Sequence, residues 1–176
     1  MSIQKNAFLS TLFSKIKQNK KTIFFLFLIF ALAFGTRSHL IIYNSMFGFD
    51  TYFHAKVIAN LLQTGSIPSI DTTAYYYLPE GGAPMTKQGL PFWYISAFIY
   101  TLLTLGAGYS KQQWINIAKL LPALYGSLVA VSMYFLGKEI FSSKKAGYLS
   151  AFITAITPAY VYRTMAGFLE EDSMVP

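Results

Sequence analysis

The chain alternates long uncharged stretches with short charged ones. Residues 22–36 carry no charge, and after Arg37 the apolar pattern resumes and continues to Tyr43. Three further runs are also uncharged: residues 88–110, 120–137 and 146–162. At 1.5 Å per residue, a helix over residues 22–43 is about 33 Å long, which is enough to cross a hydrocarbon core of about 30 Å. The pattern predicts membrane-spanning helices, with Arg37 extending along its aliphatic stem toward the outer interface.

Lysines indicate which segments face the cytoplasm, because positive residues of short loops stay on that side. Five of them crowd the first 21 residues, which contain no acid: Lys5, Lys15, Lys17, Lys20 and Lys21. Three more lie in the short connection between the last two runs: Lys138, Lys144 and Lys145. An even number of spans has to separate these two basic segments. We therefore predict that the aromatic-rich residues 88–110 lie at the membrane interface and do not span.

The predicted fold class is an all-α, multi-pass protein of the cell membrane with a cytoplasmic N-terminus. It comprises a basic N-terminal segment (1–21), spans at about 22–43, 115–137 and 146–162, an outer loop with interfacial helices (44–113) and the start of a second, acidic outer loop (163–176). For the first run a secretory signal peptide is the alternative, since a basic segment precedes it and Ala31-Leu32-Ala33 resembles a cleavage site.

Composition supports a membrane protein and excludes several other classes. The chain is 54% hydrophobic and only 12% charged, about half the charged fraction of an ordinary soluble domain. This excludes a disordered chain, a collagen and most soluble domains. The absence of cysteine excludes disulfides and thiolate-ligated metals. The net charge of +7 is concentrated in the basic segments, so it indicates contact with anionic lipid and not with nucleic acid.

Acidic residues gather at two places that the three-span topology puts on the same, outer face. Asp50 follows the first span, and the consecutive Glu170, Glu171 and Asp172 follow the third, about 120 residues later. Carboxylate oxygens are the ligands preferred by hard divalent cations such as Mg²⁺ and Mn²⁺. The alternatives are a solvated acidic loop and, for Asp50, a helix cap or turn residue. A fourth span would put the two groups on opposite faces.

The residues around these acids resemble the catalytic subunit of oligosaccharyltransferase, most closely its archaeal members. Tyr162-Arg163-Thr164-Met165-Ala166-Gly167-Phe168-Leu169-Glu170-Glu171-Asp172 is similar to the family's second acidic motif. Gly48-Phe49-Asp50-Thr51-Tyr52-Phe53-His54 resembles its first acidic motif. Tyr77-Leu78-Pro79-Glu80-Gly81-Gly82-Ala83-Pro84 resembles the Pro/Gly-rich part of the same outer loop. The resemblance extends from about residue 47 to residue 176.

The resemblance implies a glycosyltransferase of the GT-C type. Such enzymes transfer an oligosaccharide from a polyprenyl or dolichyl phosphate or pyrophosphate carrier to the Asn amide of Asn-x-Ser/Thr in an acceptor polypeptide. By this likeness Asp50, Glu170 and Asp172 would bind the divalent cation, Mn²⁺ or Mg²⁺. Asp50 would also polarise the acceptor amide, and Arg163 would orient the acids.

The chain departs from the family pattern at several positions. Thr51 stands where Pro is common and Glu170 where many members have Asp, and Glu171 could replace either neighbouring acid. His54 could be a ligand or a hydrogen-bonding loop residue. No Trp-Trp-Asp motif occurs, so we interpret the chain as an N-terminal fragment that is inactive by itself. The alternatives are another lipid-carrier GT-C enzyme (a protein O-mannosyltransferase or a lipid-modifying transferase), and a non-enzymatic transporter or scaffold subunit.

Overall fold

The computed structural model describes residues 19–71, 83–84 and 89–174, and helices dominate these residues. The longer helices are α2 (Lys20–Ser38), α3 (Phe49–Thr64), α4 (Leu90–Leu103), α5 (Lys111–Ile140) and α6 (Lys144–Ile156). The shorter elements are η1 (His39–Ile42), α7 (Pro158–Arg163), η2 (Glu171–Met174) and the strands β1 (Ile70–Asp71) and β2 (Ala83–Pro84). The strands form one antiparallel pair, in which Ile70 lies opposite Pro84. The all-α prediction therefore holds apart from this two-residue pairing.

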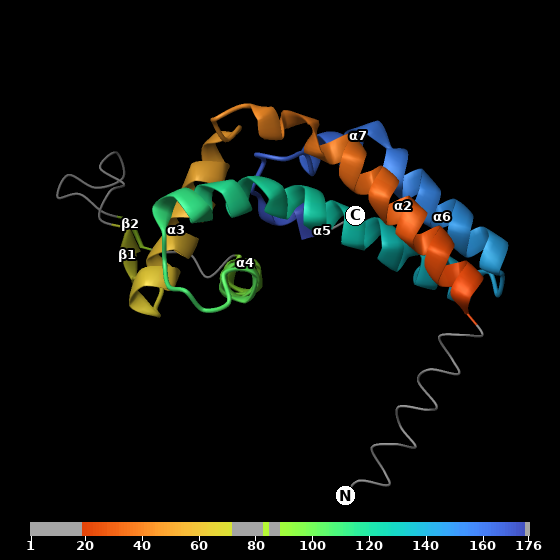
Figure 1. Cartoon of the computed structure of the whole chain (residues 1–176), viewed down its shortest axis with the longest axis horizontal. Coiled ribbons are helices and arrows are strands. Elements are labelled where there is room, and N and C mark those ends of the chain that lie inside the picture. Colours follow the sequence, from red (N-terminus) through yellow and green to blue (C-terminus); the bar gives the residue numbers. More distant parts are fainter. Residues whose placement is uncertain (1–18, 72–82, 85–88, 175–176) are drawn as a thin grey trace, which may run out of the picture.

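The helices form two groups that share α5. Figure 1 shows α2 and α6 running alongside the C-terminal part of α5, whereas α3 and α4 lie near its N-terminal part. In the same view α4 is seen end-on while α5 runs across the picture, so their axes cross steeply. At about 45 Å, the 30-residue α5 is long enough to serve both groups.

Two helices of the described residues are long and apolar enough to cross a membrane. They are the continuous helical stretch Lys20–Ile42 and the helix Lys111–Ile140. The third predicted span, residues 146–162, is interrupted: α6 ends at Ile156 and α7 begins at Pro158. Proline lacks the backbone N–H and clashes with the preceding turn, which explains the break. Three uninterrupted spans are therefore not what the structure shows, and the number of crossings stays a prediction.

The aromatic-rich run that we predicted to lie at the interface forms α4, a helix of 14 residues. Its length of about 21 Å is less than the hydrocarbon thickness of about 30 Å. The helix begins after Gly89, which has a φ of +80°, and Pro91 occupies its first turn. A short helix that crosses α5 steeply suits the interfacial placement, which stays a prediction.

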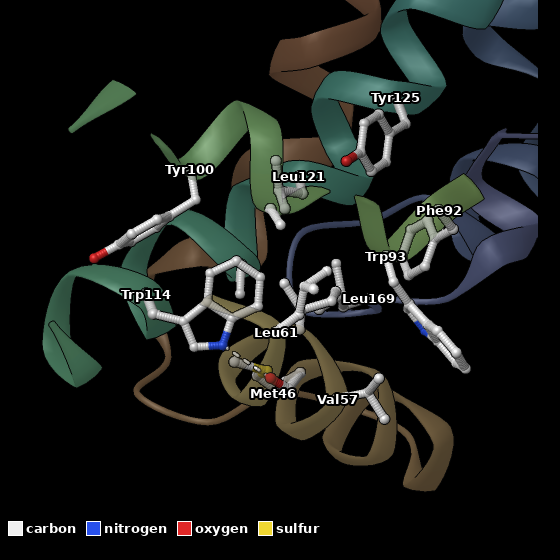
Figure 2. Packing of buried hydrophobic residues seen from close by; sticks show 14 residues of the cluster. Met46, Val57, Leu61, Phe92, Trp93, Tyr100, Trp114, Leu121, Tyr125 and Leu169 are labelled. Atoms are coloured by element: carbon white, nitrogen blue, oxygen red, sulfur yellow. Dashed lines mark hydrogen bonds between the residues drawn. The ribbon is translucent and has the colours of Figure 1, made fainter. Parts of the chain in front are cut away.

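A mainly aromatic core joins α3, α4 and the N-terminal part of α5. Its largest side chains come from α4 and α5 and are shown in Figure 2 together with Val57 and Leu61 of α3 and Leu169 from the segment after α7: Phe92, Trp93, Tyr100, Trp114 and Tyr125. Buried polar tips have partners, because Trp114 Nε1 donates to the Ala55 carbonyl at 3.0 Å and Tyr125 shares a 2.7 Å hydrogen bond with Ser96. Met46, from the segment after η1, and Leu169, from the segment after α7, both belong to this core. The core therefore holds these two segments in place relative to each other.

Small residues line the contact among α2, α5 and α6. Ala33, Ala130 and Ala155 form a fully buried cluster at this contact. A Cβ on Gly147 would lie 2.6 Å from the Tyr134 carbonyl oxygen, so α5 and α6 approach each other too closely for a side chain there. Large apolar side chains of the same helices point outward, as expected for helices that pack in lipid.

The predicted position of Arg37 is wrong. Its side chain does not extend toward the interface but is fully buried, with 0% of the residue exposed. The guanidinium donates to the Ala155 carbonyl at 2.8 Å and to Thr164 Oγ1 at 2.7 Å. The uncharged helix pattern could not reveal these partners, because they lie more than 100 residues later in the chain.

Candidate functional site

The acidic segment, residues 164–174, is fixed at its start by backbone hydrogen bonds to three separate parts of the chain. The Ala166 amide donates to the Arg37 carbonyl at 2.8 Å, and the Gly167 amide donates to the Lys119 carbonyl at 2.8 Å. The Phe47 amide donates to the Gly167 carbonyl at 2.9 Å. Gly167 has a φ of +93°, and a Cβ there would meet the Phe47 ring at 2.8 Å. Glycine is therefore required where the chain turns toward the acids.

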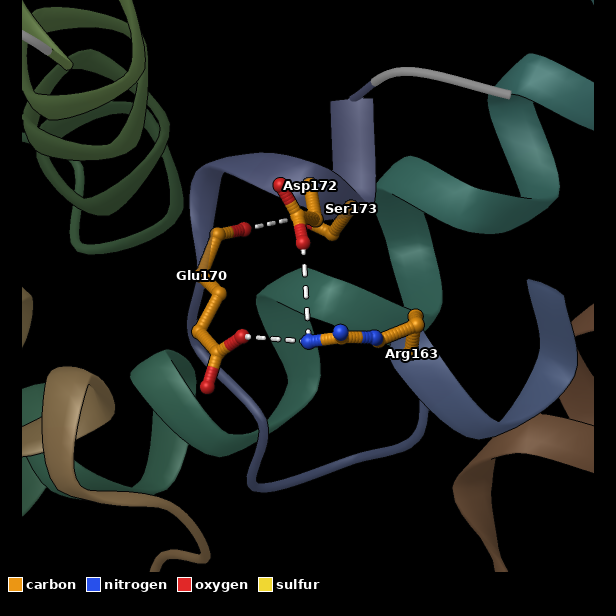
Figure 3. Close-up of polar contacts among 4 residues, drawn as sticks. All are labelled: Arg163, Glu170, Asp172 and Ser173. Atoms are coloured by element: carbon orange, nitrogen blue, oxygen red, sulfur yellow. Dashed lines mark hydrogen bonds and ion pairs between the residues drawn. The ribbon is translucent and has the colours of Figure 1, made fainter. Parts of the chain in front are cut away.

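Two carboxylates of this segment face one arginine. Arg163 Nη1 lies 3.6 Å from Glu170 Oε2 and 3.6 Å from Asp172 Oδ2, as Figure 3 shows. The Arg163 and Asp172 side chains are 60% and 57% exposed, while the Glu170 side chain is only 17% exposed. Ser173 Oγ donates to the Glu170 carbonyl at 2.7 Å and fixes the turn between the acids. The structure thus places Glu170 and Asp172 beside the same arginine, and their predicted role as metal ligands stays a prediction.

Asp50 lies in the first turn of α3 and is exposed. The pKa of Glu170 is raised, first by burial and then by the negative charge of Asp50, with Asp172 adding to the shift and Arg163 opposing it. Asp50 is thus near enough to act on Glu170 electrostatically. Within the described ranges, however, no three His, Cys, Asp or Glu side chains are gathered closely enough to hold a metal ion.

The residues nonetheless suit a hard cation chemically. The Glu170 carboxylate lies against the start of α3, where a Cβ on Gly48 would be 2.9 Å from Glu170 Oε1 and 3.4 Å from Thr51 Oγ1. Thr51 is fully buried, and its hydroxyl has no hydrogen-bond partner among the residues that the structure describes. Carboxylates with an excess of negative charge beside an unpaired hydroxyl are oxygen donors of the kind that Mn²⁺ and Mg²⁺ bind.

Glu171 points to a different helix from its two neighbours. A Cβ on Gly89, which precedes the first residue of α4, would lie 2.9 Å from Glu171 Oε2 and 3.2 Å from the Trp93 ring. The amide groups at a helix start favour a negative charge. Glu171 therefore lies beside α4, while Glu170 and Asp172 share Arg163.

His54 is a hydrogen-bonding residue in this structure. It is buried, and its Nδ1 accepts a hydrogen bond from Trp93 Nε1 at 2.8 Å. Burial lowers the pKa of His54, although the charges of Glu171 and Asp50 oppose this shift. In the neutral ring the proton is then on Nε2, so neither nitrogen offers a free lone pair to a metal. His54 thus makes a hydrogen bond, but it does so from within α3 and not from a loop, and its role as a ligand stays a prediction.

Sequence reasoning missed the groups that support the acids. Three of these groups are buried: Thr164, Lys119 and Gly126. The Lys119 ammonium donates to the Tyr43 carbonyl. Arg37 and Lys119 were the available signals, since a charged residue in a predicted span usually has a functional partner. The sequence identifies the two charged residues, but it does not identify the carbonyl and hydroxyl groups that accept hydrogen bonds from them.

Comparison with known proteins connects this arrangement to one family. Residues 21–175 match the family model described as Oligosaccharyl transferase STT3, N-terminal. The matched range includes both the start of α3 and the acidic segment up to η2.

Several curated archaeal proteins are similar to this chain. Dolichyl-phosphooligosaccharide-protein glycotransferase 2 of Archaeoglobus fulgidus is 28% identical over 121 residues, which are 69% of this chain and 19% of that protein. Glycotransferase 1 of the same organism is 26% identical over 160 residues, covering 89% and 25%. Glycotransferase 2 of Pyrococcus horikoshii is 24% identical over 131 residues, covering 74% and 16%. The matched stretch is thus a quarter or less of each relative.

Proposed function

Because the chain belongs to the oligosaccharyl transferase STT3 family, we propose that it forms the acidic half-site of a membrane glycosyltransferase. The enzyme transfers an oligosaccharide from a polyprenyl or dolichyl phosphate or pyrophosphate carrier to a protein. The acceptor is the side-chain amide of Asn in Asn-x-Ser/Thr. The names of the archaeal relatives, which state a dolichyl-phosphooligosaccharide and a protein, support this donor and acceptor class.

The observation that carries the proposal is that the second acidic motif reaches the start of α3, where the first motif lies. A Cβ on Gly48 would be 2.9 Å from Glu170 Oε1, and Asp50 is in the first turn of the same helix. Burial raises the pKa of Glu170, and the negative charge of Asp50 adds to this shift. Arg163 contacts both Glu170 and Asp172 and aligns them. A transferase that must stabilise a departing phosphate needs such oxygen ligands on one surface.

Each residue has a distinct role in this proposal. Asp50, Glu170 and Asp172 would hold Mn²⁺ or Mg²⁺, and the bound ion would supply Lewis-acid stabilisation of the donor phosphate. Arg163 keeps the two acids of the second motif oriented by charge-assisted contacts. Asp50 also accepts a hydrogen bond from the acceptor amide and increases its nucleophilic character. Glu171 stays at the start of α4, outside the ligand set.

The same proposal includes a GT-C architecture in the cell membrane. Three crossings separate a cytoplasmic N-terminus from an outer acidic surface, and α3 and α4 lie at the outer interface. The support is the two membrane-length helices of the described residues, together with Lys138 in the last turn of α5 and Lys144 and Lys145 at the start of α6.

The test uses Asp50→Asn and Asp172→Asn in the full-length protein, reconstituted in liposomes with a lipid-linked oligosaccharide and a labelled sequon peptide. We expect each variant to lose at least about 100-fold in transfer rate, because ligand loss should match or exceed the effect of losing an outer-shell partner. Mn²⁺ binding, followed by electron paramagnetic resonance, should weaken in parallel.

Glu139→Gln is the matched control, since Glu139 is an exposed acid in the last turn of α5. It should leave both transfer and Mn²⁺ binding unchanged. Transfer at the wild-type rate in both aspartate variants would contradict the proposed site. Unchanged Mn²⁺ binding with lost transfer would contradict the ligand roles alone.

A further inference from the structure

We propose that Arg37, in the first membrane helix, is a positioning residue for the acidic site. It holds Thr164 and Tyr160, and through them it sets where Arg163 and Glu170 lie. The inference rests on the proposed function for its activity readout, and a separate distance measurement tests the geometry itself. The Arg37 junction is defined as Arg37 with the groups that it binds: Thr154, Ala155, Tyr160 and Thr164.

The guanidinium of Arg37 donates to the Ala33 carbonyl of its own helix at 3.0 Å, and its other main partners come from residues 154–164. Its Nε donates to Thr164 Oγ1 at 2.7 Å, and its Nη1 donates to the Ala155 carbonyl at 2.8 Å. Its Nη2 donates to the Thr154 carbonyl at 3.3 Å, and its guanidinium carbon lies 5.3 Å from the centre of the Tyr160 ring. A planar fork of donors over an aromatic face is a geometry that lysine cannot reproduce.

The helix break explains why a cation is needed at this point. Pro158 has no N–H to donate to the Thr154 carbonyl, so α6 ends with unpaired carbonyl groups inside the protein. Arg37 pairs two of them, and its positive charge also lies at the negative end of the α6 dipole. The junction therefore makes it possible to redirect the chain from α6 into α7.

Two short routes lead from the junction to the acids. Thr164 follows Arg163 directly, and its hydroxyl donates to the Tyr160 carbonyl at 2.6 Å while it accepts from Arg37. The Tyr160 hydroxyl donates to the Ser173 carbonyl at 3.3 Å. Ser173 in turn bonds the Glu170 carbonyl. A shift of Arg37 would consequently move both the Arg163 guanidinium and the Glu170 carboxylate.

α5 is shaped to admit this arrangement. A Cβ on Gly126 would lie 2.7 Å from Thr164 Cβ and 2.8 Å from Arg37 Nε. Real Cβ atoms do not come this close to neighbouring atoms, so only glycine leaves room for the Arg37–Thr164 pair. Arg37 of α2, Gly126 of α5 and Thr164, which follows α7, are remote in sequence but have matching features around one hydrogen bond.

The experiment compares Arg37→Lys, Thr164→Val and their double variant in the full-length protein. Each single change should lower kcat by about 10- to 100-fold, the range for residues that orient metal ligands, with KM for the peptide little changed. The kcat of the double variant should be no lower than that of the less active single variant, because both changes remove the same Arg37–Thr164 interaction. Thr164→Ser, which keeps the hydroxyl, should recover most of the wild-type kcat.

Ser38→Ala is the matched control in α2, since Ser38 Oγ donates only within its own helix, to the Phe34 carbonyl at 2.6 Å. It should leave kcat unchanged. The geometric readout uses spin labels at Ile42→Cys and Ala159→Cys, two exposed positions of a chain that lacks native cysteine. Their distance distribution, from double electron–electron resonance, should broaden in Arg37→Lys and stay narrow in Ser38→Ala.

The outcomes separate the two proposals. Loss of kcat together with a broadened distance distribution supports the positioning role. A broadened distribution with unchanged kcat overturns it, because the junction would then be structural only, and an unchanged distribution overturns it as well. Absent transfer in the wild-type protein would overturn the proposed function, and the distance measurement would still decide on the junction.

Discussion

Arginine and threonine occur on both sides of the acidic segment, but their surroundings differ. The inner side is the one around Arg37 and Thr164, and the outer side is the one around Arg163 and Thr51. On the inner side Arg37 is fully buried and donates to Thr164 and to three carbonyl groups, whereas on the outer side Arg163 is 60% exposed and has two ion pairs at 3.6 Å. Thr164 and Thr51 are both fully buried, but only the first has hydrogen-bond partners within the described residues. The inner side is built to hold a conformation, and the outer side keeps groups unpaired or loosely paired, as a ligand site requires.

The largest expected difference is between the two arginines. Arg37→Met should lower the free energy of unfolding by at least about 3 kcal/mol, because each buried acceptor that it leaves unpaired costs about 1–3 kcal/mol. Arg163→Met should change it by less than about 1 kcal/mol, since exposed ion pairs contribute little. Unfolding in mixed micelles, followed by tryptophan fluorescence, measures both. Equal losses in the two variants would remove the distinction between the sides.

Crowding the inner side should have the next largest effect. Gly126→Ala puts a methyl group against Thr164 and Arg37 and should destabilise the protein by about 1–3 kcal/mol, the usual result of overpacking. Gly35→Ala is the control, because no atom lies within 4 Å of a Cβ there. It should be neutral or stabilise by up to about 1 kcal/mol, through the helix propensity of alanine. The same unfolding assay shows whether Gly126→Ala lowers the free energy of unfolding while Gly35→Ala does not.

The two buried threonines sharpen the comparison further. Thr164→Val removes a hydroxyl with two partners and should cost about 1–2 kcal/mol of stability. Thr51→Val removes an unpaired hydroxyl and should leave stability unchanged or slightly higher, while it weakens Mn²⁺ binding. Parallel unfolding and Mn²⁺ titrations of both variants give the answer. Destabilisation by Thr51→Val would mean that its hydroxyl has a structural partner.

The smallest effect is a pH dependence confined to the outer side. The pKa of Glu170 is raised above its usual 4.5 by burial and by Asp50. Just above pH 4.5 the folded protein therefore binds more protons than the unfolded chain, so stability falls as pH rises through the raised pKa. Glu170→Gln should remove this fall and be more stable than wild type at pH 7. Denaturation at several pH values, taken as the difference between the two proteins, isolates the contribution.

The sequence predicted the elements that depend on local pattern. Uncharged runs located α2 and α5, and the aromatic-rich run became the short helix α4. Arg163, Glu170 and Asp172, which the motif predicted as site residues, lie together as two ion pairs, and their roles stay predictions. These features follow from residues that are close in sequence or from a resemblance carried by contiguous motifs.

What the sequence did not predict depends on contacts between distant segments. Arg37 was placed at the interface because hydropathy treats a charge in a span as something to be moved toward water. Its partners include the Thr164 hydroxyl and the carbonyls of Thr154 and Ala155. Those carbonyls are available because Pro158 interrupts the helix, which a hydropathy pattern does not indicate. The unpaired hydroxyl of Thr51 was invisible for the same reason, since pairing is a property of the packed structure.

The Arg37 junction also imposes an order on synthesis in the membrane. Arg37 and Thr164 are 127 residues apart, which a ribosome needs roughly 6 to 25 s to translate. Throughout this interval the Arg37 guanidinium has the Ala33 carbonyl of its own helix but none of its partners from residues 154–164. The contacts that bury Arg37 can therefore be completed only after Thr164 has been synthesised.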